Sequence, residues 1–583
     1  MTLRGVFASL LLIALSAGVA SAKKAPRYEP ARQLTAEQSS LVDKAIGQEK
    51  VLIKSVQQRT PLVETYIQDT RPDVKLYQVP VADSYMLSRV DFGKGFFDKS
   101  YQSKAAAARG FFKGSLESIA NLTKALGLDS KFTYNPLGFT EMMFLDPSEF
   151  DRQHYAFSFV GKEFLGSVRT WVFDVHPKVS GIGRFYGRVW IEDEEANIVR
   201  FNGTFTAPAN DSTKHFFHFD SWRTNVQPGI WLPVAVYVEE THRGDAQNSS
   251  GLKAQTHFWG YSLKLPTRDS ENVTVKVDQA DDKSDDSQDV SPLQASRNWI
   301  TQAEQNVIDR LVEAGLVAPL TPNGYENTVL DQIVINLAVP NNLALVSPVH
   351  CRVLLTNTIE ATTVGNTLLL SKGLIDAMPN EESIASVVAL ELAHIAMGHH
   401  IDTRYAFNDR LLFPDESSFQ RIEMFHSDHD DEAAARKAME YLEASMYKNK
   451  LPSAGLFWVQ LADRAKVLKQ LNSPRLGDSM LRADGSPWMT ELARNATRLN
   501  WDDLSQTAAL PLGSWLKTDP WDDRVQMLNA RRYAPANPRD KMPLEVTPVF
   551  YKLQRFKAAN LMPAKTAVPA PAAPSAGGEP SGR

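Results

Sequence analysis

The sequence contains almost no cysteine, because Cys351 is the single one among 583 residues. One cysteine excludes a disulfide bond within the chain, and it also excludes a cysteine-rich zinc or iron–sulfur site. Basic residues are not in excess either, since the formal net charge is -5 at pH 7. That balance argues against a nucleic-acid-binding protein that relies on a basic surface, although it leaves room for a local basic patch.

Long apolar runs are missing after the first 22 residues. Arg4, a mostly apolar run at residues 7–19 and the small residues Ala20-Ser21-Ala22 form the pattern of a secretory signal peptide, with cleavage expected after Ala22. The apolar run is shorter than the roughly 20 residues that a membrane anchor needs. We therefore expect a secreted or periplasmic protein whose mature chain has no transmembrane span.

Two shifts in composition divide the chain. Residues 267–296 are rich in aspartate and almost free of aromatic side chains, which predicts a flexible acidic linker. Residues 563–583 are rich in proline, alanine and glycine, which predicts a disordered tail. Between these segments we expect a β-rich domain at residues 30–266 and a second domain at residues 297–562.

The two domains differ in their apolar periodicity. In the first, Phe185, Val189 and Ile191 alternate with polar residues, and turn residues separate such runs, which predicts an antiparallel sheet with one buried face. Helices are expected before it, at about 36–57 and 103–127. The second domain is mainly helical, with helices expected at about 381–400, 430–447, 453–471, 487–498 and 521–532, and short strands at 332–338 and 366–370. The predicted fold class is α+β with several domains.

The helix expected at 381–400 carries the most informative motif. Asn380 is suited to cap its amino terminus. Glu391 and His394 follow at a spacing of three, which places both side chains on one face of a helix. Zinc peptidases use H-E-x-x-H, in which two histidines bind one ion and the glutamate polarises the attacking water. Here Leu390 occupies the position of the first histidine, and a lone E-x-x-H is more often a surface pair.

The segments before this helix follow one order: Asn357-Thr358, Glu360-Ala361, Val364-Gly365-Asn366, Thr367 to Leu370, and Gly373-Leu374-Ile375. From Val353 to His400 the chain therefore resembles the zinc metallopeptidase family of the CAAX prenyl endopeptidases, HtpX and BepA. The resemblance implies a mainly helical, gluzincin-like domain with zinc as cofactor, Glu391 as catalytic base and His394 as a metal ligand. It also matches Glu432 to the family's third ligand and Arg524 to a conserved arginine of a later block.

The departures from the family pattern lie at chemical positions. Leu390 offers no lone pair, Arg436 stands where the family has an aspartate, and Asp519 stands where it has a histidine. A general base alone contributes roughly 10²–10⁴-fold to a rate, which cannot replace the metal's effect on water. We therefore expect an incomplete zinc site and a peptidase that is weakened or inactive.

Several histidines are possible accessory ligands: His399, His400, His426 and His429. His426, His429 and Glu432 are spaced by three and share a face if their helix begins early. One of them would then restore a three-ligand site. The alternative is that this acidic segment is a solvated helix entrance and that His399 is a packing residue.

The β-rich domain carries a second, less specific resemblance. Residues 172–205 are similar to a hairpin of LolA-like lipoprotein-carrier domains, through Pro177-Lys178, Gly187-Arg188-Val189-Trp190 and Val199-Arg200. The resemblance implies a curved sheet whose apolar face binds acyl chains or an unfolded segment. The aromatic residues available to line it are Phe185, Trp190, Phe216, Phe219, Trp222 and Trp231. The same residues could equally be an ordinary core.

Two functions are compatible with these patterns. The first is an envelope zinc endopeptidase acting on unfolded or envelope polypeptides, with Glu391 as base and His394 and Glu432 as ligands. The second is a non-catalytic chaperone or peptide- or lipid-binding pseudopeptidase of the cell envelope. Lipid or lipoprotein is a further candidate partner, and nucleic acid is not expected.

Overall fold

The computed structural model of the chain describes residues 33–73, 77–92, 95–99, 139–146, 149–178, 184–205, 215–242, 251–263, 292–318, 325–343, 348–401 and 424–500, with three short strands beyond them. The predicted signal peptide, the helix expected at 103–127, most of the acidic linker, Arg524 and the carboxy-terminal tail lie outside these residues. Within the described residues, no helix is both long and apolar enough to cross a bilayer.

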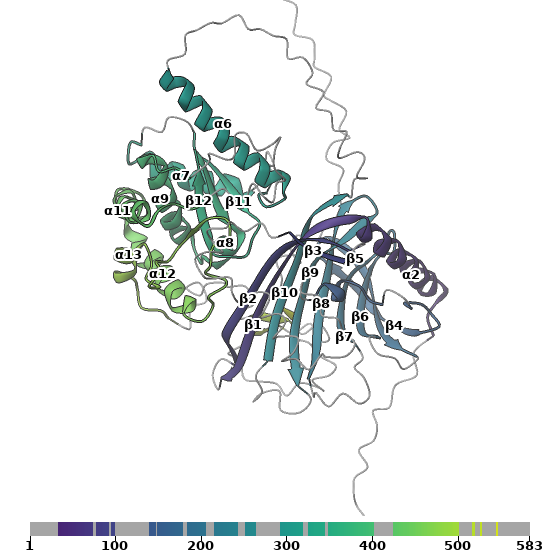
Figure 1. Ribbon diagram of the computed structural model, residues 1–583. Coiled ribbons are helices and arrows are strands. Elements are labelled where there is room, and N and C mark those ends of the chain that lie inside the picture. The colour runs from purple at the N-terminus through teal and green to yellow at the C-terminus, as the bar shows by residue number, and fades with distance from the viewer. Residues whose placement is uncertain are drawn as a thin grey trace, which may run out of the picture.

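The described residues of the first domain form one helix, one short 3-10 helix and a large sheet. Its elements are α2 (Ala36–Gln57), β1 (Arg59–Asp73), β2 (Tyr77–Asp91), β3 (Gly95–Lys99), η2 (Thr140–Met143), β4 (Tyr155–Leu165), β5 (Val168–Pro177), β6 (Phe185–Glu192), β7 (Ile198–Phe205), β8 (His215–Gln227), β9 (Ile230–His242) and β10 (Gly251–Leu263). In the described part of the chain these ten strands pair antiparallel in the order β3-β2-β1-β10-β9-β8-β7-β6-β5-β4 (Figure 1). The predicted antiparallel sheet is confirmed.

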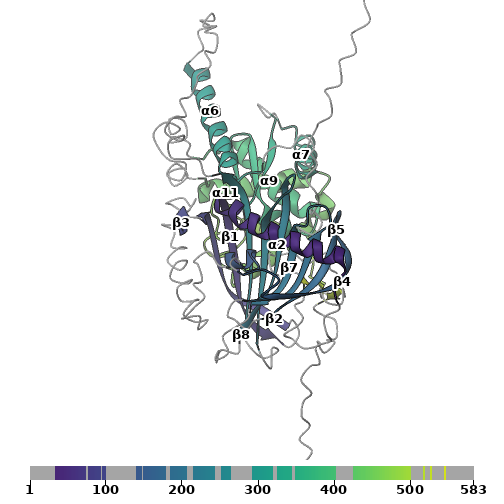
Figure 2. The ribbon, with the colours of Figure 1, turned by 90° about the vertical axis from the view of Figure 1, so that its right-hand side faces the viewer.

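Helix α2 lies across one face of this sheet (Figure 2), in contact with β1, β6, β7 and β9. A capping box begins it: the Gln38 backbone N–H donates to Thr35 Oγ1 at 3.2 Å, and the Thr35 backbone N–H donates to Gln38 Oε1 at 2.9 Å. Buried Arg223 of β8 donates to both carboxylate oxygens of buried Glu49 at 2.7 Å. This charge-assisted pair holds the helix on the sheet.

The aromatic residues expected to line one apolar face are divided between two faces. Phe185 and Phe219 belong to the core beneath α2, whereas Trp190, Trp222 and Trp231 belong to a separate buried cluster. Successive side chains of a strand point to opposite faces, so Trp190 cannot share a face with its buried neighbours Val189 and Ile191. The side chain of Phe216 lies outside the described ones.

The second domain surrounds a small sheet with helices. Its elements are α6 (Pro292–Glu313), α7 (Tyr325–Ala338), β11 (His350–Leu354), β12 (Glu360–Val364), β13 (Thr367–Ser371), α8 (Lys372–Ala377), α9 (Glu381–Met397), α11 (Asp428–Ala444), η4 (Lys448–Lys450), α12 (Leu451–Ala465), β14 (Asp478–Ser479) and α13 (Thr490–Arg494). Short strands β15 (Leu516–Thr518), β16 (Val525–Met527) and β17 (Leu544–Glu545) form a separate sheet. The main sheet has the order β11-β13-β12-β14, and only β11 and β13 pair in parallel among its described strands. The overall α+β class is confirmed.

Two expected elements are wrong, and one helix begins earlier than expected. The strand expected at 332–338 is part of helix α7, because Leu330, Ile333, Val334 and Leu337 recur at helical spacing and are all buried. Helix α6 begins at Pro292, inside the segment expected to be linker. Strand β16 lies within the helix expected at 521–532.

Helix α9 is the centre of the second domain and contacts α7, α11, α12, β12 and β13. The predicted cap is confirmed, since the Ser383 backbone N–H donates to Asn380 Oδ1 at 3.0 Å. The helix ends at Gly398, whose φ of +71° is the left-handed conformation that glycine adopts without steric cost. It therefore ends three residues earlier than expected, and His399 and His400 lie beyond it.

The two domains share a core along β1. Val63 and Ile67 face the core beneath α2, and the alternate residues Leu62 and Tyr66 join the apolar core of the second domain. Polar contacts cross the same boundary: Arg89 donates to the Ala314 carbonyl at 2.7 Å, and the Trp259 indole N–H donates to the Gly315 carbonyl at 2.7 Å. Both faces of β1 are buried, so the two domains pack against each other along this strand.

A buried carboxyl lies within this boundary. Glu64 Oε1 accepts hydrogen bonds from the Tyr85 hydroxyl and the Asn357 backbone N–H, both at 2.6 Å, and Glu64 Oε2 lies 3.8 Å from His257 Nδ1. Burial raises the pKa of Glu64 to about 7, with a smaller contribution from Glu360, against the lowering effect of its two hydrogen bonds and of Lys372. Burial also lowers the pKa of His257 to about 3, so no imidazolium balances an ionised Glu64.

We predict that the contribution of Glu64 to this boundary decreases as the pH rises. The folded-state pKa of Glu64 is raised above its ordinary value of 4.5, so its stabilising contribution is complete below pH 4.5 and is lost as the pH approaches 7. The difference corresponds to about 3 kcal/mol at about 1.36 kcal/mol per pH unit. Burial of His257 acts in the opposite direction, because its pKa is lowered in the folded protein, so the contribution of Glu64 is measured as a difference between two proteins. Between pH 4.5 and pH 8, the unfolding free energy of the wild type, measured by denaturant unfolding, should fall by about 3 kcal/mol relative to that of Glu64→Gln.

Exposed Glu443 provides the matched control, because Glu443→Gln should retain the wild-type pH dependence. A Glu64→Gln protein whose unfolding free energy changes with pH in the same way as the wild type's would show that Glu64 does not make this contribution.

Candidate metal centre

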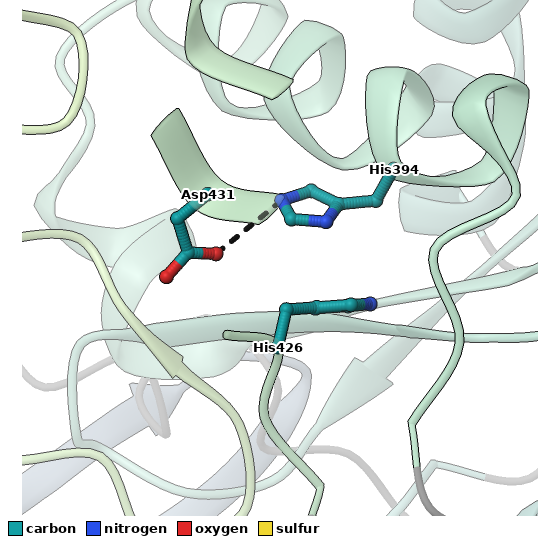
Figure 3. Close-up of side chains that lie close together, drawn as sticks. All are labelled: His394, His426 and Asp431. Atoms are coloured by element: carbon teal, nitrogen blue, oxygen red, sulfur yellow. Dashed lines mark ion pairs between the residues drawn. The ribbon is translucent and has the colours of Figure 1, made fainter. Parts of the chain in front are cut away.

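Three potential metal ligands converge in the second domain: His394 of α9, His426 of the irregular segment before α11, and Asp431 of the first turn of α11 (Figure 3). One ligand atom from each lies within 4.8 Å of the other two, and all three residues are buried. His394 Nε2 is 3.4 Å from Asp431 Oδ1. Two ligands of one tetrahedral zinc ion lie roughly 3.3 Å apart, so this pair already has a suitable separation.

His394 has the protonation state that metal binding requires. Burial lowers the pKa of its imidazole to about 2, and the neighbouring His426 and His399 add to this effect. The ring is therefore neutral at physiological pH and keeps a lone pair for a metal. Its Nδ1 lies 3.1 Å from His399 Nδ1, which leaves Nε2 facing Asp431.

His426 is held in an equally defined orientation. Its Nδ1 lies 2.6 Å from Asp478 Oδ2, and its ring centroid is 4.0 Å from that of His394. Its other ring nitrogen, Nε2, lies 3.2 Å from the hydroxyl of Thr363. An imidazole whose Nδ1–H is directed at a carboxylate presents Nε2 as the acceptor, which is the usual arrangement of a metal-binding histidine.

The structure places Asp431, and not the expected Glu432, beside His394. Glu432 is largely exposed and forms an ion pair of 3.4 Å with Arg436 one turn further along α11. The buried face of α11 contains Ala434, Ala435 and Ala438, and Asp431 precedes these by three, four and seven residues. Helical periodicity therefore directs Asp431 inward and Glu432 away from the centre. The alanine stripe is the sequence signal that identifies Asp431.

Glu391 is the most unusual group near the centre. It has no exposed surface, and neither carboxyl oxygen has a hydrogen-bond partner. Burial raises its pKa well above the ordinary range, and the negative charges of Asp478 and Asp431 raise it further. An unsatisfied buried polar group costs about 1–3 kcal/mol, so its presence in a folded domain needs a functional explanation. A bound cation nearby would offset this cost by favouring the ionised form.

The other candidates have different positions. His399 is mostly buried and contacts His394, whereas His400 pairs with Glu304 at 3.1 Å, outside the cluster. Helix α11 begins only at Asp428, so His426 lies before it. The side chain of His429 lies on the helix and is 90% exposed. The shared helix face expected for His426 and His429 therefore does not form. Leu390 is buried on α9 one turn before His394 and offers no ligand atom.

Two imidazoles and one carboxylate are a donor set found in catalytic zinc sites. The residues present fit such an ion: a neutral His394, an oriented His426, an acidic Asp431 and an unpartnered carboxyl at Glu391. The centre is built from three separate elements, so a bound ion would tie α9, α11 and the segment before α11 together.

Comparisons with known proteins add little to this geometry. No protein-family model matches the chain, and no curated protein matches it in sequence. The solved complex of Pseudomonas aeruginosa MucA and MucB has 10% sequence identity, covers 39% of this chain and 100% of that chain, and gives a TM-score of 0.14. MucB in complex with MucA(peri) gives 9% identity, coverage of 39% and 99%, and a TM-score of 0.13. Values this low establish neither fold nor function, and the resemblances to zinc metallopeptidases and LolA-like domains stay predictions.

Proposed function

We propose that this protein is an exported zinc-dependent hydrolase of the metallopeptidase type that acts on polypeptides in the cell envelope. The observation that carries the proposal is the convergence of His394, His426 and Asp431 beside the unpartnered carboxyl of Glu391. In this proposal His426 provides the ligand that the sequence lacks at Leu390, and Asp431 takes the place expected for Glu432.

Zinc bound by these three residues would lower the pKa of a water from about 15.7 to about 7 and would polarise a peptide carbonyl. Glu391 lies on the same helix face as His394, about one turn away. With a cation bound to favour its ionised form, the Glu391 carboxylate would accept a proton from the attacking water and return that proton to the leaving amine. His399, which contacts His394, restrains the ring.

The deep burial of the centre favours a second candidate function. Glu391 is 0%, His394 1% and His426 3% exposed, so an extended polypeptide reaches them only after a rearrangement. A closed, fully ligated zinc site is typical of structural zinc. In this alternative the metal stabilises a non-catalytic domain that binds polypeptides or lipids.

One experiment on the full chain tests the proposal and separates the two candidates. We expect close to one zinc per chain after dialysis against buffered zinc, and casein cleavage that a chelator abolishes and added zinc restores. Bound zinc that raises the melting temperature without any cleavage supports the structural alternative. A protein that retains no zinc would contradict both.

A further inference from the structure

With leucine at position 390, α9 contains one histidine, His394, that can bind a metal. A second imidazole reaches the centre from another part of the chain, but His426 lies in an irregular segment before α11, without helical hydrogen bonds to fix it. A ligand on such a segment needs support from a neighbouring element, because a loose ligand loses conformational freedom each time a metal binds.

Asp478 provides that support through two contacts. Its Oδ1 accepts the backbone N–H of His426 at 2.6 Å, and its Oδ2 lies 2.6 Å from the imidazole Nδ1 of the same residue. One carboxylate thereby fixes both the main chain and the ring of His426. Since both carboxylate oxygens are placed as acceptors in these contacts, the arrangement puts the proton on Nδ1 and leaves the lone pair on Nε2.

Asp478 is itself rigidly placed. It lies on β14, which pairs antiparallel with β12 through Ala361. The segment before β14 is held by buried Glu360, whose Oε2 accepts the backbone N–H groups of Arg475 at 2.5 Å and Leu476 at 2.8 Å. At Gly477 a Cβ atom would lie 2.8 Å from the Ala361 carbonyl oxygen, so the two strands approach as closely as glycine allows. The position of Asp478 therefore does not depend on a metal.

We propose that Asp478 is the positioning residue that makes His426 a metal ligand, and that the His426–Asp478 pair replaces the ligand missing at Leu390. This inference rests on the metal centre of the proposed function. In addition, β14 determines which nitrogen of His426 faces the ion, although β14 lies far along the chain from α9.

Thr363 allows a second test of the same assignment, in which the expected change in zinc affinity has the opposite sign. With the proton on Nδ1, the Thr363 hydroxyl donates to His426 Nε2 at 3.2 Å. That hydrogen bond occupies the lone pair that a metal needs, so it competes with metal binding. A net contribution of about 0.5–1.5 kcal/mol for one hydrogen bond corresponds to roughly 2–10-fold in affinity. Thr363→Val should therefore bind zinc more tightly than the wild type by roughly that factor.

The decisive variant is Asp478→Asn in the full chain. Its amide oxygen can still accept the His426 backbone N–H, but its NH₂ group now faces Nδ1 and requires an acceptor there. The proton moves to Nε2, which can then no longer bind a metal. We expect a 10–100-fold loss of zinc affinity in competition titrations with a chelating dye, the range typical for residues that orient metal ligands. Asp428→Asn, in the exposed first turn of α11, is the matched control and should leave the affinity unchanged.

The tautomer is measured independently of any metal. In ¹⁵N-histidine-labelled, metal-free protein, the ring nitrogen shifts of His426 should show an Nδ1–H tautomer in the wild type and an Nε2–H tautomer in Asp478→Asn. Cobalt(II) in the wild type should give visible bands that weaken in the variant at equal metal concentration.

The outcomes separate this inference from the proposed function. Equal zinc affinity and the same His426 tautomer in wild type and Asp478→Asn would overturn the role of Asp478 while leaving hydrolysis intact. The expected affinity loss in a protein that cleaves no peptide supports the role of Asp478 and removes the hydrolase proposal. If Asp478→Asn does not fold, Thr363→Val is the remaining test. A zinc affinity of Thr363→Val that is unchanged or weaker than that of the wild type would overturn the assignment of Nε2.

Discussion

Replacing Glu391 with glutamine should lower the rate of casein cleavage by about 10²–10⁴-fold, the usual contribution of a general base, while the zinc content stays at the wild-type level. Glutamine keeps the size and the buried position of the side chain but accepts no proton from water. Since Glu391 lies outside the three-ligand cluster, its replacement should not remove the metal. Initial rates at saturating zinc, together with metal analysis of the same samples, measure both effects.

Glu432→Gln is the control for this experiment, because Glu432 is exposed on α11 and paired with Arg436. It should retain wild-type cleavage and zinc binding, although the sequence alone assigns Glu432 to the metal. Undiminished cleavage by Glu391→Gln would remove Glu391 from the mechanism. A strong loss of zinc in Glu432→Gln would mean that α11 is rotated relative to the structure described.

Replacing His426 with alanine should weaken zinc binding by on the order of 10²–10³-fold. Structural zinc sites with four ligands bind with about 10–16 kcal/mol, so one ligand accounts for about 3 kcal/mol. His429→Ala is the matched control, since that side chain is 90% exposed and lies three residues away. Competition titrations compare the affinities, and thermal unfolding of the metal-free proteins shows whether His426→Ala folds. Equal affinities for the two variants would exclude His426 from the site.

A second substitution tests whether His426 truly replaces the residue missing from α9. Positions 390 and 394 share a helix face, so a histidine at 390 can reach an ion bound by His394. We expect Leu390→His to restore most of the zinc affinity in the His426→Ala background. No recovery in a folded double variant would show that Leu390 does not face the ion.

The helix with the E-x-x-H motif was within reach of sequence analysis. Asn380 at its start and the apolar residues between it and His394 have a periodicity that only a buried helix satisfies, and the helix begins where expected. The alternating strands of the first domain were predictable for the same reason, since a half-buried sheet imposes a period of two. Helix α7 was mistaken for a strand because a short apolar run is compatible with both structures.

The residue of α11 that lies beside His394 is one position away from the residue that the resemblance implies. Aligning a motif by residue type favours Glu432, whereas the geometry of α11 turns each successive residue by about 100° and directs Asp431 inward. The spacing of His426 and Glu432 predicts a shared helix face only if the helix begins early, but His426 lies in irregular chain before α11. No local pattern connects His426 to its partner Asp478, which follows 52 residues later.

By itself, the sequence determined the local elements and the candidate chemistry of α9, because helix caps and apolar periodicity act between residues a few positions apart. The tertiary structure alone decided which side chains meet around His394. That choice depends on the rotation of α11, on an irregular segment and on a two-residue strand that reach the same buried point from distant parts of the chain. Such convergence is set by packing between elements, and no spacing along the chain encodes it.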